Sequence, residues 1–366
     1  MSKWSECKLG EQINLKRGYD LPARLRQDGE IPIFSSSGIT GFHNEKMCNA
    51  PGVITGRYGT IGQVFFSKTP YWPLNTTLYV QDFKGNDELF IYYFLQQLDW
   101  EKYSDKSAVP GVNRNDVHQE DIVIPQVTEQ KAIAAVLSCL DDKIDLLHRQ
   151  NKTLEAMGEA LFRQWFVEET QEDWEEYSIS DFADHIKSNV TPAKFSSETF
   201  LHYSLPAFDE GKRPAVELGG AILSNKYKVV SNSILVSKLN PRVPRIWPIG
   251  ELQDKNAVCS TEFQVLKPKS CKLYGYLYFL LRSSDAVDSL IMAASGTSGS
   301  HQRVKPEDIL DIKTDLPSIE LAELYSNLVM PSLNKTQSNL VQIQTLERLR
   351  NSLLPKIMNG EVRVAV

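Results

Sequence analysis

The sequence predicts a mixed α+β or α/β protein in which one globular module occurs twice, with two long helices separating the copies. Three observations support this fold class: an internal repeat, a long helical pattern after each copy, and a length of 366 residues, more than one ordinary domain needs. We expect a pseudo-twofold arrangement with the helices packed as an antiparallel coiled coil. The expected divisions are residues 1–125 for the first module, 126–168 for the first helix, 169–317 for the second module and 318–366 for the second helix.

The internal repeat consists of five pairs of segments in the same order along the chain. Each copy begins with a tryptophan, Trp4 or Trp174, followed by a short strand pattern and a polar capping residue. Further along, an apolar strand pattern ends in a basic residue, Arg57 or Lys238. The matched segments are 4–11 with 174–181, 52–59 with 233–240, 75–80 with 260–265, 93–95 with 278–280, and 111–117 with 303–309. One module used twice is the economical interpretation.

A proline and then a long helical pattern follow each copy. Mostly apolar residues recur there at spacings of three and four, which is typical of a coiled-coil seam. The seam positions that we single out as spacer or subunit-interface residues are Leu140, Leu147, Asn151, Leu154, Leu161, Ile343, Leu346 and Leu353. The polar Asn151 would fix the register at a cost in stability, and Gly158 would let another backbone come close. Each helix would be about 50 Å long, more than one DNA turn of about 34 Å.

Composition and charge limit the class of protein. Hydrophobic content of 42% and charged content of 23% are those of a soluble globular protein. No apolar run approaches the roughly 18 residues needed to cross a bilayer, and the first residues lack the apolar core of a signal peptide, so we expect a cytoplasmic protein with no membrane partner. The net charge of −6 looks wrong for a nucleic-acid binder, but residues 126–176 hold 12 acidic and 5 basic residues, which leaves +1 for the rest.

The search for catalytic or metal-binding motifs is negative. The sequence contains no phosphate-binding loop, zinc-protease motif, nucleophile elbow or adenine-methyltransferase motif. Five scattered cysteines and six histidines show no ligand spacing. Asp141, Asp142 and Asp145 are interpreted as a salt-bridged helix face rather than a nuclease site, because Lys143 and Arg149 lie near by. We therefore expect no catalytic residue, metal or cofactor on this chain.

The remaining candidates are polar and basic loops suited to reading DNA bases. Arginine and lysine pair with guanine, asparagine and glutamine with adenine, and small hydroxyls with either. Residues 203–250 carry 7 basic and 3 acidic residues, as expected where phosphates are neutralised. The predicted DNA-binding residues are, in the first module, Ser35, Ser36, Ser37, His43, Arg57, Tyr58, Lys106, Ser107, Asn113 and Arg114, and in the second, His202, Tyr203, Lys238, Asn240, Arg242, Arg245, Ser300, His301, Gln302 and Arg303.

The module order and three segments resemble the specificity subunits of type I restriction-modification systems over essentially the whole chain. The segments are residues 109–114, 160–166 and 354–362. The resemblance implies two target recognition domains that each read one half of a split site in double-stranded DNA, and helices that set their distance and dock two modification subunits. S-adenosylmethionine, ATP and Mg would be bound by those partners and by the restriction subunit. The second module departs from the family's loop in residues 300–305 and in residues 241–245, which suits an asymmetric target.

Two other classes of function remain as alternatives. A stand-alone DNA-acting enzyme with unfamiliar carboxylates is disfavoured by the missing motifs. A protein-interaction scaffold explains the helices equally well, but it leaves the basic loops without a purpose. Binding to random duplex DNA, measured at stated salt with and without modification subunits, would separate these classes.

Overall fold

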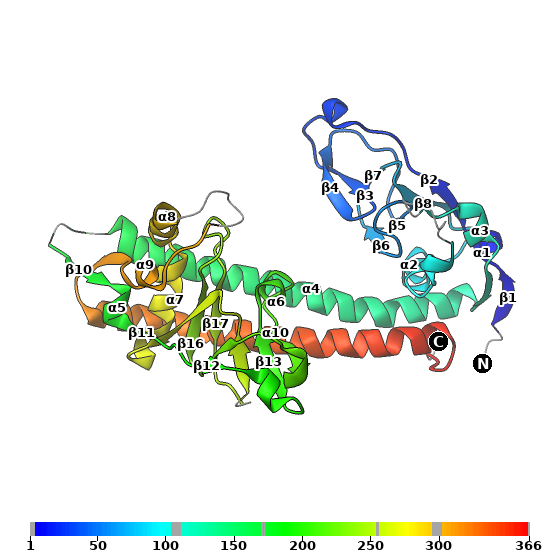
Figure 1. Cartoon of the computed structure of the whole chain (residues 1–366). Coiled ribbons are helices and arrows are strands. Elements are labelled where there is room, and N and C mark those ends of the chain that lie inside the picture. The colour runs from blue at the N-terminus through cyan, green and yellow to red at the C-terminus, as the bar shows by residue number, and fades with distance from the viewer. Residues whose placement is uncertain are drawn as a thin grey trace. The chain divides into compact units, whose positions relative to one another are not determined.

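The computed structural model describes residues 4–103, 111–169, 171, 173–253, 256–294 and 302–364. The chain forms two compact units: unit 1 comprises Met1–Leu146 and Ile343–Val366, and unit 2 comprises Leu147–Gln342. Two long helices, α4 (Val127–Arg163) and α10 (Ile319–Met358), contribute residues to both units (Figure 1). None of the described helices is both long enough and apolar enough to cross a membrane.

Unit 1 is built on two small sheets and one strand pair. Its sheets have the strand orders β2-β8-β5-β6 and β4-β3-β7, and β1 pairs with β9 in antiparallel fashion. Besides its parts of the long helices, its elements are β1 (Ser5–Lys8), α1 (Leu9–Gln12), β2 (Asn14–Arg17), η1 (Ala23–Leu25), β3 (Ile31–Ser35), β4 (Gly38–His43), β5 (Gly52–Gly56), β6 (Val64–Ser67), β7 (Trp72–Pro73), β8 (Thr77–Asp82), α2 (Glu88–Leu95), η2 (Trp100–Tyr103), α3 (Arg114–His118) and β9 (Asp121–Ile124).

The main core of unit 1 lies between the first sheet, α2 and the two long helices. Leu9, Val53 and Phe90 are fully or almost fully buried in it, together with Leu137 of α4 and Ile357 of α10. Asp87 is the N-cap of helix α2: its carboxylate accepts a hydrogen bond from Phe90 N at 2.8 Å. The long helices are therefore an integral part of the core of unit 1.

Unit 2 has the same plan with a larger second sheet. Its sheets have the orders β11-β19-β16-β17 and β12-β15-β18-β13-β14, and β10 pairs with β20 in antiparallel fashion. Its elements besides the long helices are η3 (Gln164–Glu168), β10 (Glu175–Ser178), α5 (Ile179–Phe182), β11 (Ala183–His185), β12 (Asn189–Val190), η4 (Pro192–Phe195), β13 (Thr199–Tyr203), α6 (Leu205–Asp209), β14 (Ala215–Leu218), η5 (Gly219–Ala221), β15 (Lys226–Lys228), β16 (Ser233–Ser237), β17 (Ile246–Ile249), β18 (Ala257–Cys259), β19 (Phe263–Pro268), η6 (Cys271–Leu273), α7 (Tyr274–Arg282), α8 (Ser284–Ala293), α9 (Pro306–Leu310) and β20 (Lys313–Leu316).

The internal repeat is confirmed in the first strand pair, the short helix that follows it and the first sheet of each unit. In both copies a four-residue strand leads directly into a four-residue helix, and the strand pairs with the strand that precedes the long helix. The short helices are capped alike, because Glu11 accepts a hydrogen bond from Lys8 N and Asp181 accepts one from Ser178 N. The first sheets also share one strand order, with β8 and β19 each flanked by the equivalent neighbours.

The predicted alignment of residues 75–80 with 260–265 is wrong by one residue. In the structure Gly56 lies opposite Thr77 and Ser237 lies opposite Phe263, so Thr77 corresponds to Phe263 rather than to Glu262. Thr77–Val80 and Phe263–Leu266 are buried at every position. A strand that is buried on both faces shows no alternation of apolar and polar residues, so its register cannot be read from its pattern.

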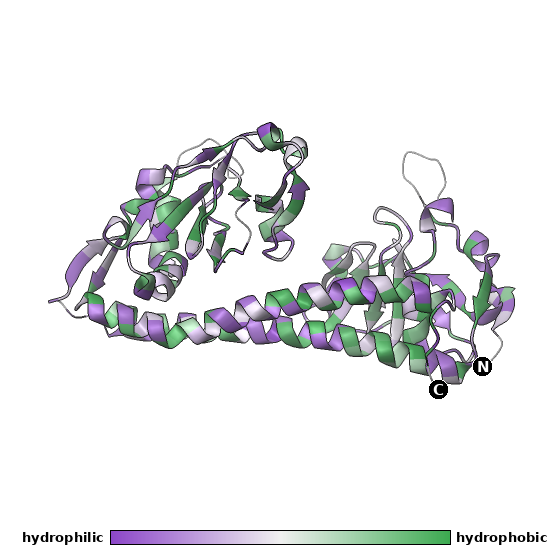
Figure 2. Ribbon diagram, turned by 90° about the horizontal axis from the view of Figure 1, so that it is seen from below, coloured by the Kyte–Doolittle hydropathy of each residue, from purple (hydrophilic) through white to green (hydrophobic). Residues whose placement is uncertain are grey.

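The long helices pair in antiparallel fashion within each unit, as the sequence predicts. In unit 1 Arg350 of α10 donates to Asp141, and Arg363, beyond the end of α10, donates to Glu129. In unit 2 Asn339 and Tyr325 donate to Asn151 and Gly158, so the order again reverses along the partner helix. Figure 2 shows the hydrophobic and hydrophilic residues alternating along both helices. Of the predicted seam residues, Leu147, Asn151 and Ile343 are buried, and the half-buried ones are Leu140, Leu154, Leu161, Leu346 and Leu353.

The structure differs from the predicted seam at Gly158 and Asn151. Gly158 is a site of close approach, but the neighbour is a side chain rather than a backbone: a Cβ added at Gly158 would lie 2.1 Å from Cζ of Phe279 in α7. Asn151 has a buried polar partner, Asn339, which the sequence pattern passed over. The aspartates of α4 are salt-bridged as expected, with Asp141 bound by Arg350 and Asp142 by Lys68.

His118 at the end of α3 joins that helix to β2. Its Nε2 accepts a hydrogen bond from Leu15 N at 2.9 Å, which requires this nitrogen to be unprotonated. Burial, followed by the positive charges of Arg114 and Lys84, lowers the pKa of His118 below its usual value of 6.5. The unfolded chain therefore takes up more protons than the folded one as the pH falls through 6.5, and stability is lost over that range down to the folded pKa.

We expect the urea midpoint for unfolding of unit 1 to fall when the pH is lowered from about 7.5 to about 5.5. His118→Gln should remove part of this dependence, because the amide oxygen can accept the same hydrogen bond without titrating. His148→Gln, at an exposed position on α4, is the matched control and should leave the dependence unchanged. The same pH dependence in wild type and His118→Gln would contradict the assignment.

Candidate nucleic-acid interface

In unit 1 three arginines surround a surface cavity of about 420 Å³. Arg17 ends β2, Arg57 directly follows β5, and Arg114 begins α3. The sheet order places the first two close together, because β8 pairs with both β2 and β5 at Leu78. A backbone bridge between Tyr58 and Gly111 brings the start of α3 to the same place. The full lining is Arg17, Arg57, Tyr58, Leu78, Gly111, Val112, Asn113 and Arg114.

Arg57 is held more firmly than its neighbours. Its backbone N donates to Thr76 O at 2.8 Å, and its O accepts from Val112 N at 2.9 Å. Its guanidinium carbon lies 4.4 Å from the centroid of the Tyr58 ring, and Nη2 donates to the Tyr58 hydroxyl at 3.2 Å. The guanidinium group is thus supported by an aromatic face and a hydrogen bond before any ligand arrives.

Gly111 makes this arrangement of Tyr58 possible. A Cβ added at residue 111 would lie 2.2 Å from Cε1 of the Tyr58 ring, much closer than non-bonded carbons approach. The ring therefore occupies the space that any other side chain at residue 111 would need. Glycine here is required by packing against the ring.

The serine turn of residues 35–37 lies beside the Arg57 loop. Ser35 Oγ donates to Gly38 O at 3.1 Å, which fixes the turn between β3 and β4. Ser36 faces the loop, since its Oγ would lie 3.3 Å from a Cβ added at Gly59. The structure therefore brings together the predicted residues Ser35, Ser36, Ser37, Arg57, Tyr58, Asn113 and Arg114 on one side of unit 1.

Unit 2 repeats the backbone of this site with different side chains. Lys238 N donates to Glu262 O at 2.8 Å, Lys238 O accepts from Val304 N at 3.0 Å, and Leu239 bridges to Arg303. These contacts correspond one for one to those of Arg57, Tyr58 and Gly111. Asn240 N also donates to Gln302 O at 2.9 Å, so Lys238, Asn240, Gln302 and Arg303 gather on one surface.

Part of the positive charge of the unit 2 surface is compensated. Arg303 forms an ion pair with Glu262 at 3.1 Å, at the position where unit 1 has the neutral Thr76. Burial lowers the pKa of Lys238, whose ammonium lies 5.7 Å from the centroid of the Tyr227 ring. In unit 1, by contrast, none of the guanidinium groups of Arg17, Arg57 and Arg114 pairs with a carboxylate of a described residue.

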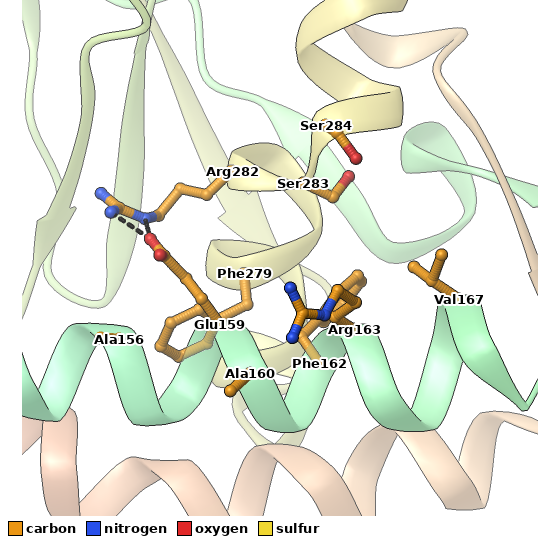
Figure 3. A pocket seen from close by; sticks show the side chains of 10 residues that line it. All are labelled: Ala156, Glu159, Ala160, Phe162, Arg163, Val167, Phe279, Arg282, Ser283 and Ser284. Atoms are coloured by element: carbon orange, nitrogen blue, oxygen red, sulfur yellow. Dashed lines mark hydrogen bonds and ion pairs between the residues drawn. The ribbon is translucent and has the colours of Figure 1, made fainter.

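A second pocket, of about 300 Å³, lies in unit 2 between α4 and the corner of α7 and α8 (Figure 3). Its two arginines are already paired. Arg282 donates to Glu159, which it faces across the pocket, and Arg163 pairs with Glu168 at 3.1 Å. A pocket whose cations are neutralised in this way is poorly suited to a polyanion.

Comparison with known proteins shows similarity to type I restriction enzyme specificity subunits. A family model described as type I restriction modification DNA specificity domain matches residues 1–156. The chain is 25% identical over 306 residues to the type I restriction enzyme MjaIX specificity subunit of Methanocaldococcus jannaschii, covering 75% of this chain and 69% of that protein. It is 22% identical over 344 residues to the HindI specificity subunit of Haemophilus influenzae, covering 71% of this chain and 72% of the relative.

The chain is similar to type I restriction enzyme specificity subunits, and its residues 1–156 match the DNA specificity domain of these systems. The fold agrees, because the crystal structure of the type I system S subunit from M. genitalium superposes with a TM-score of 0.67 at 16% identity, covering 97% of this chain and 96% of that one. The predicted resemblance to these subunits is thereby confirmed.

Four of the predicted DNA-binding residues are buried or already paired with other side chains in the structure. His43 is 5% exposed, its Nδ1 lies 3.1 Å from Gln27 N, and its ring packs on Trp72. Tyr203 is 6% exposed and packs on Trp247. His202 turns inward toward Glu217. Arg245 donates two hydrogen bonds to Asp209, at 2.7 and 2.8 Å. A loop-tip pattern cannot distinguish a side chain that faces inward.

The remaining predicted DNA-binding residues are Arg242 in unit 2 and four residues that lie outside the described residues. Arg242 is exposed in the turn between β16 and β17. The other four are Lys106, Ser107, Ser300 and His301. Contact of any of these with DNA stays a prediction.

Sequence reasoning missed Arg17 as part of the basic cavity of unit 1. Its counterpart in unit 2 is Lys187, two residues beyond His185, just as Arg17 lies two residues beyond Leu15. Extending the repeat alignment through β2 and β11 would have shown a basic residue at the same place in both copies.

Proposed function

We propose that this chain is the non-catalytic, DNA-reading subunit of a type I restriction-modification complex, with one half of a split site read by each unit. The observation that carries the proposal is the repeated backbone arrangement that presents a basic residue in both units. Val112 N binds Arg57 O at 2.9 Å and Val304 N binds Lys238 O at 3.0 Å. Two similar presentations of different side chains suit two different short sequences.

The chemistry of modification and cleavage would belong to the partner subunits. We assign S-adenosylmethionine to two modification subunits, and ATP and Mg to the restriction subunit, all acting in the cytoplasm. The paired helices α4 and α10 would dock the modification subunits and set the gap between the half-sites. Each wrong base pair costs about 1–3 kcal/mol, so two short half-sites read together give the specificity that neither gives alone.

Sequence selection with the assembled complex tests the function. The chain and its modification subunits would be incubated with random duplex DNA at about 0.1 M salt, and the bound fraction sequenced. We expect two short fixed patterns separated by an unspecified gap of constant length. Recovery of random sequence would reject the proposal, and metal-dependent cleavage by the purified chain alone would reject the non-catalytic role.

A matched insertion tests the spacing role of the helices. Seven residues added after Leu146 in α4 and seven added before Ile343 in α10 preserve the seam of both helices. The insertion lengthens each helix by about 10 Å, or about three base pairs of DNA. We expect the selected gap to lengthen by about three base pairs, while both half-sites stay the same.

The control carries the α4 insertion alone, which puts the two helices out of register and should destabilise the chain. An unchanged gap in a folded chain with both insertions would show that the helices do not measure the distance.

A further inference from the structure

The three arginines of the unit 1 cavity differ in how they are held, and this difference divides their roles. We propose that Arg57 reads a guanine in the half-site bound by unit 1, while Arg17 and Arg114 contact the DNA phosphates. The inference rests on the proposed function and deepens it, because it assigns a base to one residue.

Arg57 has the properties that base reading requires. Guanine presents O6 and N7 as adjacent acceptors in the major groove, and the planar guanidinium group can donate to both only in one orientation. The Tyr58 ring and hydroxyl restrict Arg57, and hydrogen bonds fix its backbone on both sides. A donor that is already oriented loses little conformational entropy on binding, which favours a specific contact over a diffuse one.

Arg17 and Arg114 have the properties of phosphate contacts. Both are exposed, and neither side chain makes a hydrogen bond or ion pair with another described residue. A side chain without fixed partners can bind the phosphates of the DNA backbone in several orientations, so its contact does not depend on the base sequence. Because the cavity has no carboxylate in its lining, both charges are available for phosphates.

Unit 2 has no arginine supported by an aromatic ring at the position of Arg57, so the inference applies to one half-site only. Lys238 replaces Arg57, Leu239 replaces the Tyr58 platform, and Arg303 takes the place of Gly111. Glu262 then holds Arg303 in an ion pair. Lysine can also donate to guanine, but it has no planar fork that fixes one orientation, so we do not extend the guanine assignment to Lys238.

The test compares Arg57→Lys with Arg17→Gln and Arg114→Gln in the complex assembled with modification subunits. Sequence selection gives the base preference at each position, and affinity at several salt concentrations gives the number of phosphate contacts. For Arg57→Lys we expect the preference for guanine at one position of one half-site to fall, by at most roughly 150-fold, because lysine can still donate to guanine but lacks the fixed paired donors of arginine. The salt dependence should be unchanged because the charge remains.

The other two variants should show the opposite behaviour. Arg17→Gln and Arg114→Gln should weaken binding to all sequences evenly. Each should also make the salt dependence shallower, reducing the magnitude of the negative slope of log affinity against log salt by about 0.9. Gly111→Ala should relax the same position as Arg57→Lys, because the added methyl displaces Tyr58 and with it the support of Arg57. The half-site read by unit 2 serves as an internal control for folding and should be unaffected in every variant.

Three results for Arg57→Lys would overturn the assignment: an intact preference for guanine, an equal loss of affinity for all sequences, or a shallower salt dependence of binding. A wild-type complex that selects no sequence at all would instead reject the proposed function itself. The two failures are therefore distinguishable.

Discussion

Gly158→Ala is expected to destabilise unit 2 by about 2 kcal/mol, although alanine favours helix by about 1 kcal/mol over glycine. The added Cβ would lie 2.1 Å from Cζ of Phe279 and 2.7 Å from both Cε atoms. Phe279 is 1% exposed in a core of aromatic side chains, and Figure 3 shows its ring lying over α4. The ring cannot move without disturbing Tyr325, whose hydroxyl donates to Gly158 O at 2.7 Å.

Urea unfolding of unit 2 would measure this loss. Met157→Ala, at the exposed neighbouring position, is the matched control and should change stability by less than about 0.5 kcal/mol. The double variant Gly158→Ala with Phe279→Leu should recover part of the loss relative to the two single variants added together, because the smaller side chain vacates the space. A Gly158→Ala protein more stable than wild type would mean that helix propensity outweighs packing here.

Replacing either asparagine of the buried pair in α4 and α10 by leucine is expected to cost about 1–3 kcal/mol. Asn339 is 0% exposed and Asn151 8%, and Nδ2 of Asn339 donates to Oδ1 of Asn151 at 2.7 Å. A single leucine leaves the remaining buried amide without this partner. The two changes together replace both polar groups, so the double variant should be at least as stable as wild type.

A double-mutant cycle measured by urea unfolding of unit 2 tests this pair. The expected result is a coupling energy of about 1–3 kcal/mol between Asn151→Leu and Asn339→Leu. Simple additivity of the two losses would contradict the role of the hydrogen bond. The stable double variant should also lose a unique alignment of the helices, because leucine fits every seam position and asparagine fits only opposite another polar group.

The duplication and the long helices could be predicted because their signals are local. A tryptophan before a short strand, a basic residue after a buried strand and a spacing of three and four residues are all legible in a single stretch of chain. The capping of α1 and α5 is local too, since Glu11 and Asp181 lie three residues beyond the amides that they bind. Local patterns therefore gave the order of the elements.

What could not be predicted depends on contacts between distant residues. The partner of Asn151 is 188 residues away, and it becomes apparent only when the two helices are aligned. Arg17 joins Arg57 because both neighbouring strands pair with β8. The inward direction of His43 depends on Gln27 and Trp72, and no loop pattern reports that. Some residues of the basic cavity could thus be predicted from the sequence, but which neighbouring residues join the cavity or turn away from it could not.

The participation of α10 in the core of unit 1 has a consequence for the order in which the protein is made. Leu354, Ile357 and Met358 pack with Leu9 and Ile133, yet the ribosome adds Leu354 roughly 345 residues after Leu9. At about 5–20 residues per second, tens of seconds separate them. Unit 2, which is one continuous stretch, can mature during this interval. The part of the protein that is synthesised first is therefore completed last, and its apolar helix face must be shielded from aggregation while the nascent chain grows.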